Sequence, residues 1–133
     1  MSIHPEYARA ILAGTKTVEF RKRRLADDVT HVLVYATAPV GKLVGAFTVA
    51  GQDTVAPTTL WRRFAAVAGI PRAKFFAYFA TARQGTGIRV GSVLAPPAPL
   101  NLCDTLGVAR PPQSFQYVPQ ENAAAVLTAM SPS

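Results

Sequence analysis

Apolar residues near the start of the chain recur at helical spacing. In residues 4–14, "HPEYARAILAG", Tyr7 and Ile11 fall on one face of a helix. A proline stands at the first helical position and a glycine at the C-terminal cap, the usual places for these residues. The pattern predicts a short helix.

Period-two alternation and short apolar runs then predict three strands, in residues 17–21, 31–37 and 42–51, with a turn in residues 38–41. In the first strand, "TVEFR", Val18 and Phe20 point to one side. The other side, which we expect to be the less buried, carries Thr17, Glu19 and Arg21.

Three further helices are predicted in the rest of the chain. Helices are expected over residues 57–69, 71–80 and 119–130, and residues 85–102 predict a turn, a strand and an extended proline-rich segment. We expect residues 110–118 to be irregular and residues 131–133 to fray. Short strands interrupted by a helical pair indicate an α+β fold, with a small β-barrel flanked by short helices.

Length and composition fit one globular domain over residues 1–133. Half of the 133 residues are hydrophobic and 16% are charged, so the chain can bury a core. No apolar run is long enough to span a membrane, and the start of the chain lacks the pattern of a signal peptide. A single cysteine, Cys103, cannot form an internal disulfide, which favours a cytoplasmic location.

The charge distribution points to a phosphate-bearing partner. The formal net charge is +7, and no acidic residue lies between Asp53 and Asp104. That stretch carries Arg62, Arg63, Arg72, Lys74, Arg83 and Arg89. Such a field attracts RNA, another nucleic acid or a nucleotide-like small molecule. The alternative is a charge that serves solubility alone.

The sequence does not support a phosphate-binding loop or a metal site. Thr15 precedes Lys16 where a phosphate-binding P-loop requires glycine, and the glycines of residues 85–91 open a strand rather than a helix. His4 and His31 are not spaced as metal ligands with Cys103. We expect capping or surface roles for both histidines, and neither a metal nor a cofactor.

Residues 14–24, "GTKTVEFRKRR", hold the densest charge in the chain. Lys16 at the turn and Glu19 and Arg21 on the strand form either a structural ion-pair cluster at a barrel rim or a polar pocket. In a pocket, Glu19 would accept from the amino edge of a base. The surface expected to contact nucleic acid comprises Lys22, Arg23, Arg24, Arg62 and Arg63, with Trp61 and Tyr78 available for base stacking.

The segment "SIHPEYARAILAGTKTVEFRKRR" resembles the opening of ASCH domains, a branch of the PUA-like β-barrel superfamily. The matching residues are Gly14, Lys16, Thr17, Glu19 and Arg21. "VLVYATAPVGKLVGAFTV" resembles the two strands that follow in that family, and "RPPQSFQYV" its closing segment. The resemblance covers most of residues 2–118.

The resemblance implies a small β-barrel with a cleft lined by residues 16–21 and a role in RNA or nucleotide binding. Some family members are ribonucleases, and others hydrolyse N4-acetylcytidine. In the amidohydrolase branch, a Thr follows the Lys by three residues and a distant Glu assists. Glu19 occupies the Thr position here, and residues 54–103 contain no acid.

We therefore expect a binder of RNA or of a nucleotide ligand, a function compatible with a regulatory role, with a polar cleft formed by Lys16, Thr17, Glu19 and Arg21. The alternative is a metal-independent hydrolase, either a ribonuclease or an N4-acetylcytidine-type amidohydrolase. In that case Lys16 and Glu19 would be the catalytic pair. A second acidic residue near Lys16 would favour the enzyme. Basic residues clustered outside a closed cleft would favour binding without catalysis.

Overall fold

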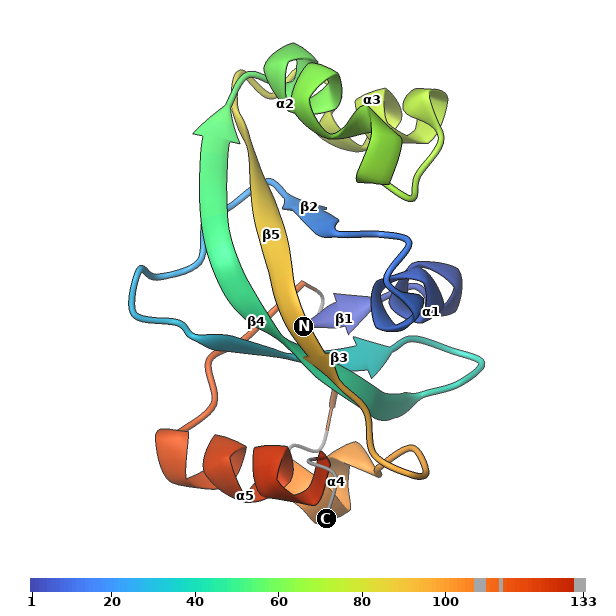
Figure 1. The fold of residues 1–133 in the computed structure, drawn as a ribbon, viewed down its shortest axis with the longest axis vertical. Coiled ribbons are helices and arrows are strands. Elements are labelled where there is room, and N and C mark those ends of the chain that lie inside the picture. Colours follow the sequence, from blue (N-terminus) through green and yellow to red (C-terminus); the bar gives the residue numbers. More distant parts are fainter. Residues whose placement is uncertain (107–109, 113, 131–133) are drawn as a thin grey trace.

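The computed structural model describes residues 1–106, 110–112 and 114–130. The expected fraying of residues 131–133 lies outside this part of the chain. Within it, the protein has a mixed α+β fold built on one strongly curled sheet with short helices around it (Figure 1). This arrangement confirms the fold class that the sequence predicts.

The sheet has five strands in the order β1-β3-β4-β5-β2. Their bounds are β1 Ser2–Ile3, β2 Val18–Arg21, β3 His31–Ala36, β4 Lys42–Val55 and β5 Gly85–Leu94. β1 pairs with β3 in parallel, and the other neighbours are antiparallel. The long strands β4 and β5 curve together, so the sheet forms a half-barrel (Figure 1).

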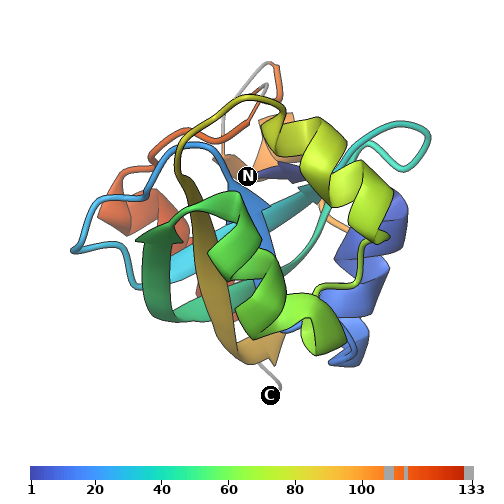
Figure 2. The same ribbon diagram turned by 90° about the horizontal axis from the view of Figure 1, so that it is seen from above.

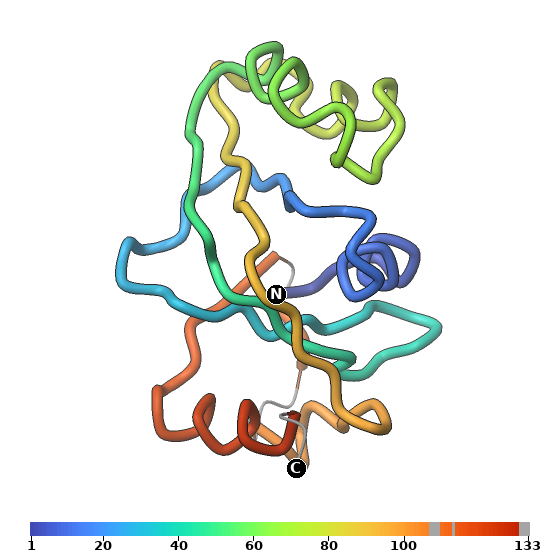
Figure 3. The backbone as a smooth tube through the Cα atoms, viewed as in Figure 1, coloured from blue at the N-terminus to red at the C-terminus, as the bar shows by residue number. Residues whose placement is uncertain are grey.

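Helices cover the two ends of this half-barrel. Their bounds are α1 Pro5–Ala13, α2 Pro57–Phe64, the 3-10 turn η1 Ala65–Val67, α3 Arg72–Phe79, α4 Leu102–Leu106 and α5 Gln120–Met130. α2 and α3 lie at one end of the β4–β5 pair, and α4 and α5 lie at the other (Figures 1 and 2). The backbone tube shows β2 following α1 directly, which places the charged segment beside the first helix (Figure 3).

Three predicted boundaries are wrong, each for a local reason. The helix expected over residues 57–69 ends at Phe64, whose φ of −119° and ψ of 4° leave helical geometry. The strand expected to end at residue 51 continues to Val55 because β5 pairs with it along that length. The turn expected at the start of residues 85–102 is absent, because β5 begins at Gly85. A side chain at Gly85 would meet the Phe79 ring at 2.3 Å, so glycine lets the strand pass beneath that ring.

An aromatic core supports β2. Val18 and Phe20 are buried, as the alternation predicts, with 0% and 7% of their surface exposed. The Phe20 ring centroid lies 4.7 Å from that of Phe75. Trp61 also packs on Phe75, with centroids 5.1 Å apart, and is half-buried. Trp61 therefore packs against this core with part of its ring exposed, and its role in base stacking stays a prediction.

The helices are short. In the described residues, none combines the length and apolar character needed to cross a lipid bilayer.

Candidate active site

Lys16 is positioned by the end of α1. Gly14 adopts the left-handed conformation, with φ of 84°, and ends the helix so that the chain turns towards β2. The Lys16 side chain then runs beneath residues 68–70 and is only 2% exposed. Its Nζ donates a hydrogen bond to the Ala68 carbonyl. A Cβ at Gly69 would lie 2.8 Å from Lys16 Cβ, so glycine leaves room for the lysine stem.

Lys16, Glu19 and Arg21 form a continuous charged chain. Lys16 Nζ lies 3.7 Å from Glu19 Oε1, and Arg21 donates to Glu19 Oε2 at 2.8 Å. The predicted convergence of these three side chains is therefore present. The side-chain exposures of Lys16, Glu19 and Arg21 are 2%, 8% and 11%. The strand face of Thr17, Glu19 and Arg21 is the less buried of the two, as expected, but it is nearly closed to solvent.

Residues distant in the sequence cover Arg21. Its guanidinium donates to the Ser2 carbonyl at 2.8 Å and to Ser114 Oγ at 3.1 Å. The Ser2 amide in turn donates to the Ser114 carbonyl at 2.9 Å. Arg21 Nε is buried and has no hydrogen-bond partner among the described residues. These contacts explain why the polar face of β2 is withdrawn from solvent.

Burial dominates the electrostatics of Lys16. Desolvation lowers the pKa of Lys16 below its usual value of 10.5, even though the Glu19 carboxylate raises it; the Arg21 charge lowers it further. The ammonium also faces aromatic rings, with Nζ 5.5 Å from the Tyr7 centroid and 5.2 Å from that of Phe20. The site thus holds a desolvated lysine next to a carboxylate.

A cleft of about 600 Å³ opens in front of Glu19 and Arg21. It lies between the β1–α1 segment, β2 and α3, and its size suits a small ligand or one nucleotide. The lining residues are Ser2, Ile3, His4, Glu6, Tyr7, Glu19, Phe20, Arg21, Thr37, Ile70, Lys74, Phe75 and Tyr78. Lys16 lies behind the wall rather than in it, and Thr17 is also absent from the lining.

Sequence reasoning missed four of the polar lining residues, namely His4, Glu6, Tyr7 and Lys74. His4 was expected to cap a helix or lie on the surface. It occupies the N-cap of α1 and is exposed, but its side chain makes no capping hydrogen bond. The four-residue spacing of Lys74 and Tyr78 on α3 was the available signal, because it places both on one helical face.

The expected nucleic-acid contacts are spread over the surface, and of these residues only Tyr78 lines the cleft. Tyr78 is 39% exposed, as predicted, and Lys22 Nζ lies 5.1 Å from its ring centroid. Arg24 pairs with Asp27 at 2.9 Å. Arg63 pairs with Asp53 at 3.6 Å. Arg23 and Arg62 are exposed.

No metal-ligand cluster is present in the part of the chain that the structure describes: no three His, Cys, Asp or Glu side chains gather there. His31 is half-buried and shares a hydrogen bond with Thr30 at 2.9 Å. Cys103 is exposed and unpaired by any disulfide.

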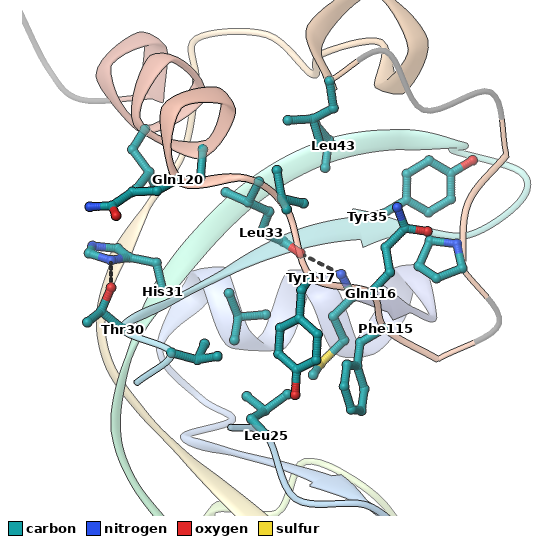
Figure 4. A pocket seen from close by; sticks show the side chains of 18 of the residues that line it. Leu25, Thr30, His31, Leu33, Tyr35, Leu43, Phe115, Gln116, Tyr117 and Gln120 are labelled. Carbon is teal, nitrogen blue, oxygen red and sulfur yellow. Dashed lines mark hydrogen bonds between the residues drawn. The ribbon is translucent and has the colours of Figure 1, made fainter. Parts of the chain in front are cut away.

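A second cavity, of about 670 Å³, lies between β3, α5 and the segment after α4. Figure 4 shows Leu33 and Leu43 facing it from the sheet, with Phe115 and Tyr117 on the opposite wall. It is the larger of the two hollows, but its lining is mainly apolar and contains none of the charged chain on β2. The smaller cleft is the stronger candidate because the titratable groups converge there.

Three comparisons bear on this site. Residues 1–93 match the family model described as "ASCH domain". The chain is 31% identical over 136 residues to a Zymomonas mobilis protein named "ASCH domain-containing ribonuclease", covering 98% of this chain and 90% of that one.

The crystal structure of ASCH from Zymomonas mobilis is 27% identical, with a TM-score of 0.86, over 98% of this chain and 94% of that one. A crystal structure of a tyrosine-to-phenylalanine mutant of that protein also has a TM-score of 0.86. It is 26% identical and covers 98% of this chain and 96% of that one.

Proposed function

The chain belongs to the ASCH domain family, and from this premise we propose that it is a metal-independent ribonuclease acting in the cleft that bears Glu19. The relative named as a ribonuclease matches almost the whole chain, which supports RNA as the substrate. The observation that carries the proposal is the Glu19 carboxylate, which lines a nucleotide-sized cleft while two buried cations hold it in place. A fixed carboxylate in such a cleft suits proton transfer.

The chemistry needs one proton acceptor and one donor. In metal-free RNA cleavage the 2′-oxygen attacks the adjacent phosphorus, and the bond to the 5′-oxygen breaks. Glu19 would accept the proton of the 2′-hydroxyl, and His4 or Tyr7, which line the same cleft, would supply a proton to the leaving oxygen. The products are a 2′,3′-cyclic phosphate and a 5′-hydroxyl.

The cleft also provides positive charge for the reacting phosphate. Arg21 and Lys74 both line it. Cations fixed at the place where negative charge develops stabilise the transition state of phosphoryl transfer. Arg21 is already oriented by Ser2 and Ser114, so little reorganisation is required when RNA binds.

Lys16 acts through Glu19 in this proposal. Its ammonium is buried behind the cleft wall and bonded to the Ala68 carbonyl, so it does not touch RNA. It is a positioning residue that holds Glu19 Oε1 from behind. This changes the role expected from the sequence, in which Lys16 and Glu19 were a catalytic pair.

A second carboxylate favours an enzyme over a simple binder. Glu6 of α1 lines the same cleft as Glu19 and could share the proton transfers there. The sequence criterion asked for a second acid beside Lys16, and among the described residues Lys16 pairs with Glu19 alone. The ribonuclease is favoured over the amidohydrolase because the matching relative is a ribonuclease and because residues 54–103 supply no acid.

RNA binding without turnover is the second candidate. Both carboxylate oxygens of Glu19 already face cations, an arrangement that suits recognition of a base as well as proton transfer. The basic residues Arg23 and Arg62 lie outside the cleft, as expected for a protein that only binds.

A cleavage assay in excess chelator separates these functions. The substrates are end-labelled RNA, DNA of the same sequence and RNA with 2′-O-methyl groups. The ribonuclease proposal expects cleavage of RNA alone, with 2′,3′-cyclic phosphate ends. Intact RNA at high protein concentration would leave the binding function, and cleavage of the 2′-O-methyl strand would exclude attack by the 2′-oxygen.

A further inference from the structure

Two lysines and a tyrosine stand together at the edge of the Glu19 cleft. Lys74 and Tyr78 both line the cleft and lie one helical turn apart on α3. Lys22, which directly follows β2, places its ammonium 5.1 Å from the Tyr78 ring centroid. One ammonium group therefore lies over the ring, and a second lysine stands one helical turn away on the same wall of the cleft.

Nothing acidic neutralises these lysines. In the described residues, neither Lys22 nor Lys74 forms an ion pair with a carboxylate. Of the two carboxylates that line the cleft, Glu19 is already held by Lys16 and Arg21, and Glu6 forms no ion pair with either lysine in the described residues. The edge of the cleft therefore presents uncompensated positive charge around an exposed ring, which is complementary to a base with a phosphate on each side.

We propose that Lys22, Tyr78 and Lys74 form a subsite for one unpaired nucleotide at the mouth of the cleft. The base stacks on Tyr78, and the phosphates on its two sides contact Lys22 and Lys74. The inference rests on the proposed function in that RNA enters the Glu19 cleft. It adds the place at which the nucleotide adjacent to the reacting nucleotide is held.

The present contact between Lys22 and Tyr78 is compatible with this role. Lys22 is exposed, and a cation lying over a ring at an exposed site is held more weakly than a base stacked on it. A base can therefore replace the ammonium over the ring. The displaced Lys22 side chain is long enough to follow the phosphate of the same nucleotide.

The ring itself is well supported. Its centroid lies 4.9 Å from that of Phe79 in an edge-to-face arrangement, and Phe79 is buried in the aromatic core. Burial raises the pKa of the Tyr78 hydroxyl more than the charge of Arg21 lowers it, so the ring stays neutral at physiological pH. A neutral ring that is supported by the core and 39% exposed suits stacking.

The test measures equilibrium binding of a short 2′-O-methyl RNA as the salt concentration is varied. This probe has no free 2′-hydroxyl, so the measurement does not depend on turnover. The double variant Lys22→Ala/Lys74→Ala should reduce the log–log salt slope by about 1.4, since each lost phosphate contact removes about 0.7. Tyr78→Ala should weaken binding roughly five- to a hundredfold, whereas Tyr78→Phe should bind normally.

A matched control removes the same charge elsewhere. Arg83→Ala/Arg110→Ala deletes two exposed arginines that do not line the cleft, and it should change the slope by less than half as much. If the two double variants change the salt slope equally, RNA is attracted by positive charge spread over the surface. That result would overturn the subsite. Absence of binding, or tighter binding of duplex than of single-stranded probe, would also overturn it. Binding as expected without any cleavage of ordinary RNA would keep the subsite and reject the ribonuclease.

Discussion

The ammonium of Lys16 lies 3.7 Å from Oε1 of Glu19, and both side chains are almost completely removed from solvent. Burying an ion pair is costly unless the remaining hydrogen-bonding groups are satisfied. Here the Ala68 carbonyl accepts from Lys16, and Arg21 donates to the second oxygen of Glu19. The pair therefore ties the turn after α1 to the cleft wall.

The lowered pKa of Lys16 predicts a specific dependence of stability on pH. Between that lowered pKa and the unfolded value of 10.5, the folded protein holds fewer protons than the unfolded chain. The free energy of unfolding must then rise with pH, by at most about 1.4 kcal/mol per pH unit. Chemical denaturation at pH 8, 9 and 10 should show this rise relative to Lys16→Met, which lacks the titrating group.

The titration of Tyr78 sets the highest pH at which that experiment reports on Lys16. Because its pKa is raised above 10.0, it has the opposite effect at higher pH, where only the unfolded chain loses the proton. If the free energy of unfolding depends on pH in the same way for the unmodified protein and Lys16→Met below pH 10, Lys16 is not desolvated.

Gly69 and Gly14 form a matched pair for testing the packing over Lys16. Both adopt positive φ, 62° and 84°, but a Cβ at Gly14 meets nothing within 4 Å, whereas one at Gly69 lies 2.8 Å from the Lys16 stem. Gly14→Ala should cost only the conformational penalty of about 1–2 kcal/mol. Gly69→Ala should cost about 1–3 kcal/mol more, because the lysine must move. Equal losses in urea denaturation would mean that residues 68–70 do not press on Lys16.

The aromatic core under β2 predicts a large effect of Phe20. Phe20→Ala should destabilise the protein by about 3–5 kcal/mol, since the ring is buried among Phe64, Phe75 and Phe79. Val93→Ala, on the exposed part of β5, should change the free energy of unfolding by no more than about 0.5 kcal/mol. A loss below 1 kcal/mol for Phe20→Ala would contradict its place in the core.

Local patterns predicted the parts of the structure that depend on neighbours in the sequence. Alternation in residues 17–21 correctly gave the strand, the burial of Val18 and Phe20 and the convergence of Lys16, Glu19 and Arg21. A period of two fixes which side chains share a face, whatever the rest of the fold.

Contacts between distant segments were not predictable in this way. Arg21 is covered by Ser114, 93 residues away, and alternation along one strand gives no sign of this contact. The cleft likewise depends on α3 lying near the start of α1, so His4 and Lys74 come to line the same cleft only in the folded chain. β1 and α4 were missed because two and five residues are too few to establish a periodicity.

The role of Glu19 is tested most directly by its single-turnover rate of RNA cleavage. Glu19→Gln keeps the shape of the side chain but removes its proton-accepting charge. The control is Glu121→Gln, at an exposed position of α5. In excess chelator, Glu19→Gln should cleave RNA about 10²- to 10⁴-fold more slowly. It should still bind the 2′-O-methyl strand, and Glu121→Gln should cleave at the normal rate. Undiminished cleavage by Glu19→Gln, or none by the unmodified protein, would contradict the assignment of this cleft as the active site of a ribonuclease.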